Sequence, residues 1–120
     1  MFERKIFTEE QNFFRETANK FLEKEVLPYH NKWEKDGYVP KELWLKAGDV
    51  GMLCPNVPKK YGGIEGDFRF NVIIIEELAK IGATGPGFAV HSDIVTPYII
   101  NYSSEKQKEK LNKEIERQYC

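Results

Sequence analysis

Three adjacent residues, His91, Ser92 and Asp93, carry the side-chain types of a hydrolytic triad. Triads are assembled in space from separate segments, and no nucleophile elbow of the form Gly-x-Ser-x-Gly surrounds Ser92. We therefore interpret the three as polar residues that interrupt an apolar helix, where they could line a groove. For His91 two roles stay open: a hydrogen bond between helices, or contact with a ligand.

Two other patterns invite a chemical interpretation. Glu76 and Glu77 are adjacent carboxylates, but neighbours on a helix point about 100° apart and cannot both reach one substrate atom. We expect one in solvent and one in an interhelical contact. The glycine-rich run 62–66 lacks the preceding strand, the Lys and the Ser/Thr of a phosphate-binding loop. It is interpreted as a tight turn that uses glycine for positive φ.

The sequence contains no pattern typical of a metal site or a redox centre. Its only histidines, His30 and His91, stand at no ligand spacing, and neither Cys54 nor Cys120 belongs to a cysteine motif. The first twenty residues contain no apolar signal-peptide core. We expect no metal site, free thiols and a cytoplasmic location.

The composition indicates a soluble, globular protein of one domain. The chain has 120 residues, of which 41% are hydrophobic and 31% are charged. Eighteen basic residues oppose 19 acidic ones, for a net charge of −1. That balance excludes the basic patch of a nucleic-acid-binding protein, and the apolar stretches are too short for a membrane span.

The first forty residues predict one long, bent helix. Thr8 and Gln11 form a capping box, so the helix should begin at Glu9. Apolar residues then recur at every fourth position: Phe14, Ala18, Leu22 and Val26. Pro28 should bend the helix without ending it, and Gly37 should end it in a left-handed conformation.

The middle of the chain predicts two helices and a connector. Lys41–Val50 follows a proline suited to a helix start, and the connector Met52–Asp67 is dense in proline and glycine. Phe68–Ile81 is apolar on most faces, as expected at the centre of a bundle. A buried strand is the alternative, but the length of the segment and its ending in Glu-Glu-Leu-Ala-Lys favour a helix.

The C-terminal part predicts a helix over Phe88–Tyr102, interrupted at Pro97. A second capping box, Ser104 with Gln107, should start a last helix over Glu105–Gln118. The expected fold is therefore an all-α, bundle-like domain of about five helices.

Several motifs, in an unbroken order, make the chain resemble the N-terminal helical domain of the acyl-CoA dehydrogenases, with a long-chain-like character. They are Phe-Thr-Glu-Glu at 7–10, Phe-Leu-Glu-Lys-Glu-Val-Leu-Pro at 21–28, Trp-Glu-Lys-Asp-Gly at 33–37, Ala-Gly-Asp-Val-Gly-Met-Leu at 47–53, Val-Pro-Lys-Lys-Tyr-Gly-Gly at 57–63, Glu-Glu-Leu-Ala-Lys at 76–80, His-Ser-Asp-Ile-Val-Thr-Pro-Tyr-Ile at 91–99 and Ser-Glu-Lys-Gln-Lys-Glu-Lys at 104–110.

The resemblance implies a three-part enzyme: this helical domain, a middle β-barrel and a C-terminal helical bundle, usually in a tetramer. Its FAD is held mainly by the later parts, and a glutamate of the C-terminal half removes the α-proton of a fatty acyl-CoA. A hydride then passes to the flavin, and an electron-transfer flavoprotein accepts the electrons. The N-terminal domain lines the acyl-chain tunnel.

Four residues carry that tunnel role over to this sequence. The helix starting at Gly87 matches the family helix whose inward face meets the acyl tail, which makes Gly87, His91, Ser92 and Val95 the expected tunnel residues. Their spacing of four, one and three would place them on one face of an α-helix.

The resemblance covers the predicted domain, residues 1–110, and gives way to a divergent helical tail, residues 111–120. We interpret that ending as a truncated or frame-shifted reading frame, or as a deliberately shortened chain, without the flavin contacts and without the catalytic glutamate. We therefore expect no catalysis and no stable flavin from the chain alone, and self-association through uncovered apolar faces. The alternative is a non-catalytic helical module that docks on an intact dehydrogenase.

Overall fold

The computed structural model describes residues 5–61, 63–83 and 85–110, and no strand occurs among them. The elements are α1 (Glu9–Glu25), α2 (His30–Asp36), α3 (Lys41–Asp49), the short 3₁₀ turn η1 (Lys59–Tyr61), α4 (Phe68–Lys80), the π-helical η2 (Val90–Val95) and α5 (Thr96–Tyr102). Residues 105–110 are helical as well. The predicted all-α fold is confirmed. The predicted tail, residues 111–120, lies outside the described part.

The first helix begins as predicted and ends earlier than predicted. Thr8 and Gln11 exchange both bonds of the capping box, at 3.0 and 3.2 Å. The expected single bent helix is wrong, because the α-helical bonding stops before Pro28, which has no amide proton. The Leu27 N–H bonds to Leu22 O, five residues back, and the His30 N–H restarts the pattern from Val26 O. The result is a turn between two separate helices.

Helices α1 and α4 are held together by a buried carboxylate. Glu77 is 1% exposed and accepts hydrogen bonds from Arg15 at 2.8 Å, Lys80 at 2.8 Å and Asn19 at 3.1 Å. Glu76 also contacts Arg15, at 2.9 Å. The expected interhelical role is confirmed for Glu77, whereas the expected solvent position of its neighbour is wrong, since both carboxylates face α1.

The connector between α3 and α4 folds back on itself without a phosphate-loop geometry. Glu65 N–H bonds to Val57 O at 2.9 Å, and Gly66 N–H bonds to Pro55 O at 2.8 Å. A Cβ on Gly63 would lie 2.0 Å from Val57 O. Close approach is thus the reason for glycine at this position, and the positive φ of the turn falls on Glu65 instead (φ 57).

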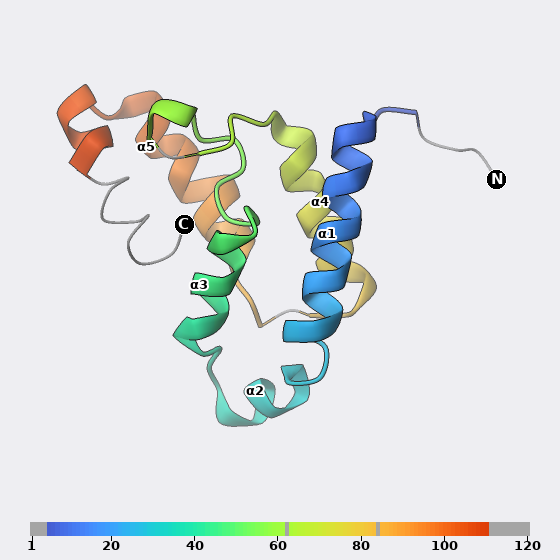
Figure 1. The fold of residues 1–120 in the computed structure, drawn as a ribbon. Coiled ribbons are helices and arrows are strands. Elements are labelled where there is room, and N and C mark those ends of the chain that lie inside the picture. The colour runs from blue at the N-terminus through green and yellow to red at the C-terminus, as the bar shows by residue number, and fades with distance from the viewer. Residues whose placement is uncertain (1–4, 62, 84, 111–120) are drawn as a thin grey trace.

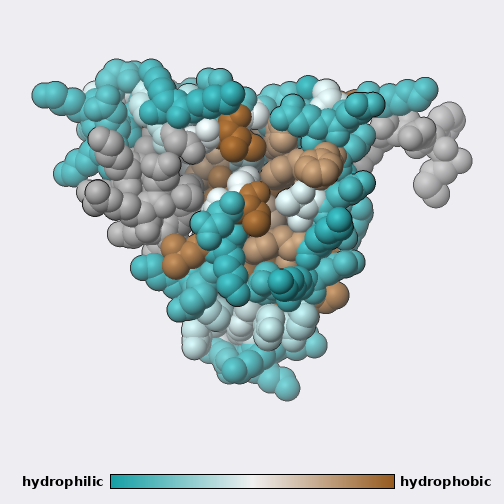
Figure 2. Space-filling model, in the orientation of Figure 1, coloured by the Kyte–Doolittle hydropathy of each residue, from teal (hydrophilic) through white to brown (hydrophobic). Residues whose placement is uncertain are grey.

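Figure 1 shows α1 and α4 side by side on one flank, α3 in front of the segment that leads into α5 on the other, and α2 at one end. The core between the flanks is built around Leu22, Met52 and Phe88. Figure 2 shows apolar surface in the hollow between the two flanks, rimmed by polar side chains. No helix in the part of the chain that the structure describes is long and apolar enough to cross a membrane.

Candidate functional site

The segment with the expected tunnel residues is continuous and not regular. Residues 88 and 89 are helical, η2 (Val90–Val95) is a π-helix, and α5 follows directly. The predicted interruption at Pro97 is wrong, because the wider π-helical turn lets Thr96 N–H bond to His91 O, five residues back, and places Pro97 in the first turn of α5. Proline is tolerated there, and π-helical turns are frequent at functional sites.

The expected tunnel residues have different surroundings. Gly87 is exposed just before the helix, His91 is half-buried and Val95 is 44% exposed. Ser92 is only 3% exposed and faces the core, where its Oγ accepts the Cys54 N–H at 3.0 Å. Ser92 thus faces away from solvent, and because Gly87 precedes the helix and residues 90–95 are π-helical, the four residues do not share one α-helical face.

The inner side of η2 packs on α3 and the connector. The ring of Phe88 meets Trp44 edge-on with centroids 4.8 Å apart, and His91 meets the same indole at 5.7 Å. Cys54 Sγ lies 3.5 Å from His91 Nδ1 and 3.4 Å from Thr96 Oγ1. Polar groups on this side thus bond to one another and hold the helix in place.

The outer side of η2 and α5 is apolar and exposed. Val90, Ile94, Tyr98 and Tyr102 stand four residues apart, and each is more than half exposed, from 54% for Ile94 to 82% for Tyr102. A recess of about 300 Å³ lies beside this row. We call these four residues the apolar row. A surface of this kind suits contact with a hydrocarbon chain or an apolar protein face.

Asp93 sits between the two sides. Its carboxylate accepts a hydrogen bond from the buried Asn71 of α4. Burial raises the pKa of Asp93 above its ordinary value, and the Asn71 bond offsets this only in part. The side chains of His91, Ser92 and Asp93 therefore bond in three directions, to Cys54 Sγ, Cys54 N–H and Asn71, which is not the arrangement of a hydrolytic triad.

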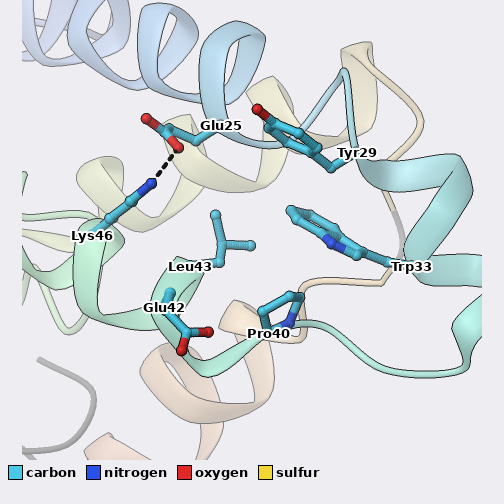
Figure 3. Close-up of a pocket in the computed structure, with 7 residues that line it drawn as sticks. All are labelled: Glu25, Tyr29, Trp33, Pro40, Glu42, Leu43 and Lys46. Atoms are coloured by element: carbon cyan, nitrogen blue, oxygen red, sulfur yellow. Dashed lines mark hydrogen bonds and ion pairs between the residues drawn. The ribbon is translucent and has the colours of Figure 1, made fainter.

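Among the hollows away from this segment, two are lined by residues of both α1 and α3. One, of about 210 Å³ at the junction of α1, α2 and α3, is walled by Tyr29 stacked on Trp33, with Leu43 and the ion pair of Glu25 with Lys46 at 2.9 Å (Figure 3). The other, of about 450 Å³, lies between α1 and α3 and is rimmed by lysines. Neither contains an expected tunnel residue, and the polar side chains drawn in Figure 3 include an ion pair already made within the protein.

The site includes residues that the sequence alone does not reveal. Cys54 contacts His91 and Thr96 from a distant part of the chain, and Asn71 reaches Asp93 from another helix. No spacing rule connects these positions. Among the described residues no three potential ligands gather into a metal site.

Comparison with known proteins decides the family. The family model of the acyl-CoA dehydrogenase N-terminal domain matches residues 8–117. The chain belongs to the acyl-CoA dehydrogenase family. It is 50% identical over 108 residues to the mitochondrial long-chain specific acyl-CoA dehydrogenase of Rattus norvegicus, covering 90% of this chain and 25% of the relative. The Sus scrofa relative of that name is 52% identical over 104 residues, 87% of this chain and 24% of the relative.

Sequence identity is lower to a relative of another name, and the fold is closely similar to a solved structure. Isovaleryl-CoA dehydrogenase of Bos taurus is 33% identical over 115 residues, 92% of this chain and 27% of the relative. The crystal structure of an acyl-CoA dehydrogenase from Geobacillus kaustophilus superposes with a TM-score of 0.88 at 47% identity, covering 95% of this chain and 30% of that one. The chain thus spans about a quarter of its curated relatives. The mammalian relatives are named mitochondrial, whereas the cytoplasmic location of this chain stays a prediction.

Proposed function

We propose that this chain is the N-terminal helical domain of a flavin-dependent dehydrogenase that introduces an α,β double bond into long-chain acyl-CoA. The observation that carries the proposal is the gradient of identity. Identity is 50–52% to long-chain specific enzymes, and it falls to 33% for isovaleryl-CoA dehydrogenase and 34% for a short-chain specific enzyme. In this domain the chain is therefore more similar to relatives named for long-chain substrates than to those named for shorter ones.

Within such an enzyme the chain contributes one wall of the acyl tunnel. The half-buried His91 and the exposed Gly87 and Val95 are the contacts with the acyl tail, and Ser92 supports them from the core side through its bond to Cys54 N–H. The exposed Val95 supports this role, since a hydrocarbon chain is stabilised by burying apolar surface. FAD belongs to the whole enzyme, and an electron-transfer flavoprotein is its electron acceptor.

The chain alone is expected to be inactive. The polar groups of its site bond to one another on the inner side of η2, and by family resemblance the flavin contacts and the catalytic glutamate belong to other domains. The purified 120-residue chain should show no flavin absorbance band and no binding of added FAD. A stoichiometric flavin band would contradict this part of the proposal.

A chimera tests the function as a whole. Replacing the matching N-terminal domain of the Geobacillus kaustophilus enzyme with residues 1–110 preserves a fold that superposes at a TM-score of 0.88. The chimera should reduce a dye with palmitoyl-CoA as substrate. A folded, flavin-loaded chimera without activity on any acyl-CoA would contradict the proposal. Specific capture of an intact dehydrogenase by such an inactive domain would favour the docking module instead.

A further inference from the structure

Two aromatic rings lie stacked at the junction of α1, α2 and α3, away from the expected tunnel residues. The backbone N–H of Trp33 bonds to Tyr29 O at 3.1 Å, the bond of one helical turn, so both side chains fall on the same side of that turn. Their ring centroids are 5.9 Å apart and the rings are inclined by 26°. Tyr29 is 49% exposed. The two rings therefore form a flat aromatic wall at the surface.

The recess beside this wall has a fixed floor. Leu43 of α3 is 4% exposed and belongs to the hydrophobic core, and Trp33 packs against that core. Figure 3 shows the two rings on one side of Leu43 and the ion pair of Glu25 with Lys46 on the other. The ion pair joins α1 to α3 at 2.9 Å. The recess is thus formed within the chain itself, which lowers the cost of binding a partner.

The size of the recess and the arrangement of its rings limit what can occupy it. Its volume of about 210 Å³ is below the roughly 300–1,000 Å³ of pockets for cofactors and drug-sized ligands, so it suits a side chain of a partner protein. Rings that stack on each other present one wall and not the several faces that enclose a quaternary ammonium group. A proline ring is apolar and nearly flat, and it packs on such a wall.

The aromatic wall also offers hydrogen-bond donors to the backbone of a proline-rich segment. Such a segment adopts the polyproline II helix, which makes no internal hydrogen bonds and leaves its carbonyls to accept. The Tyr29 hydroxyl and the Trp33 indole N–H are donors on side chains that line the recess. Aromatic-lined grooves recognise proline-rich segments by this combination of ring contact and hydrogen bonding.

The charges at the rim favour a basic residue next to the proline. Glu25, Glu42 and Lys46 line the recess, so carboxylates outnumber ammonium groups. The hydrogen bond between Glu25 and Lys46 lowers the pKa of the carboxyl and raises the pKa of the ammonium group, which keeps both charged at neutral pH. Glu42 is exposed and adds the unbalanced negative charge. A lysine or arginine of the partner is complementary to it.

We propose that the recess lined by Tyr29, Trp33 and Leu43 is a docking site for an extended, proline-containing segment of another protein, with a basic residue beside the proline. The proline packs on the aromatic wall above Leu43, and the carbonyls of the segment accept hydrogen bonds from Tyr29 and Trp33. The basic residue lies at Glu42. Because the recess contains none of the expected tunnel residues, the proposal does not depend on the proposed function.

The two tryptophans of the chain allow a direct test. NMR of the complete 120-residue chain with nitrogen-labelled tryptophan gives one indole N–H signal for Trp33 and one for Trp44, and Trp33→Phe assigns them. Trp44 packs against Phe88 outside the recess and serves as the internal reference. An oligoproline peptide that ends in a pair of arginines should move the Trp33 signal saturably at up to millimolar concentration and leave the Trp44 signal in place.

Three results overturn the proposal. In the first, the Trp33 signal stays in place at millimolar peptide. In the second, both indole signals move together. In the third, a glycine-serine peptide with the same arginines moves the Trp33 signal as far as the oligoproline does, which would mean that the recess binds a basic side chain and not proline.

Substitutions test the roles within the recess. Tyr29→Ala should weaken peptide binding by at least about fivefold, as expected for a central aromatic residue of an interface. Tyr29→Phe keeps the ring and loses one neutral hydrogen bond, so it should weaken binding by about threefold. Glu42→Gln should reduce the preference for the arginine-ended peptide over an alanine-ended one by about twofold to fivefold.

Tyr38→Ala is the matched control, because Tyr38 is 66% exposed and is not part of the recess, and it should leave binding unchanged. A folded Tyr29→Ala variant that binds the peptide as tightly as the wild type would overturn the proposal. If that variant does not fold, the titration of the wild-type chain still decides.

Discussion

The α1–α4 pair and the segment from Phe88 to Tyr102 differ in how many of their side chains find partners within the chain. The pair buries a carboxylate, Glu77, and surrounds it with donors from Arg15, Lys80 and Asn19. The segment bonds its polar groups on the inner side and leaves the apolar row exposed to solvent. The polar groups around Glu77 find their partners within the chain, whereas the apolar row is a surface that a ligand or another protein could cover.

The difference separates stability from function. A buried carboxylate whose donors come from its own chain contributes mainly to holding the two helices together. An exposed apolar surface costs free energy in water and is stabilised by an occupant. Substitutions in α1 and α4 should therefore change folding, whereas substitutions in the apolar row should change association and binding.

The largest expected effect is on the buried pair. Arg15→Met removes the half-buried partner of Glu77 and should lower the free energy of unfolding by about 3 kcal/mol, because a buried carboxylate loses a charge-assisted bond. Lys80→Met is the matched control, since Lys80 contacts the same oxygen at the same 2.8 Å but is itself 61% exposed. It should cost less than about 1 kcal/mol. Urea denaturation measures both, and equal losses would contradict the difference.

Acid should weaken the same region. Burial acts to raise the pKa of Glu77, but the bonds from Lys80, Arg15 and Asn19 outweigh it, and the pKa lies below its ordinary value of 4.5. A lowered pKa in the folded state contributes stability above the unfolded pKa, and this is lost as the pH falls through the folded one. The unfolding free energy should thus fall with pH below about 4.5, and less steeply in Glu77→Gln. Parallel pH profiles would show that Glu77 is not the source.

The apolar row should govern self-association with little effect on folding. The double substitution Ile94→Lys and Tyr98→Lys places charges on this surface and should shift sedimentation toward the monomer at high concentration. The unfolding free energy should change by no more than about 0.5 kcal/mol. Leu45→Lys on α3, where Leu45 is 41% exposed, is the control and should leave association unchanged. Association that is insensitive to the double substitution would place the contact elsewhere.

The smallest effect on stability concerns the connector between α3 and α4. Glu65 adopts φ 57, a conformation that costs a residue with a Cβ more than it costs glycine. Glu65→Gly should raise the unfolding free energy by about 0.5 kcal/mol, whereas Glu65→Ala should not. Thermal denaturation can resolve the two, and a loss of stability in the glycine variant would contradict the strain argument.

Local signals predicted the helix starts well, because a cap is decided by a few adjacent residues. The capping boxes at Thr8 and Ser104 both form. The π-helix was not predicted, and one contact at its end, between Thr96 and Cys54, joins segments that no local pattern connects. For the same reason the sequence could name His91 as a candidate site residue but not its contact with the Cys54 thiol.

The chain-length dependence of the chimera tests the central claim most directly. Val95→Trp adds a large ring at an exposed position of the proposed wall and so narrows the tunnel. It should reduce turnover of palmitoyl-CoA by at least about tenfold and leave turnover of butyryl-CoA, whose acyl chain is short, nearly unchanged. A loss of the same size on both substrates, or no loss on either, would show that this segment does not line the acyl tunnel.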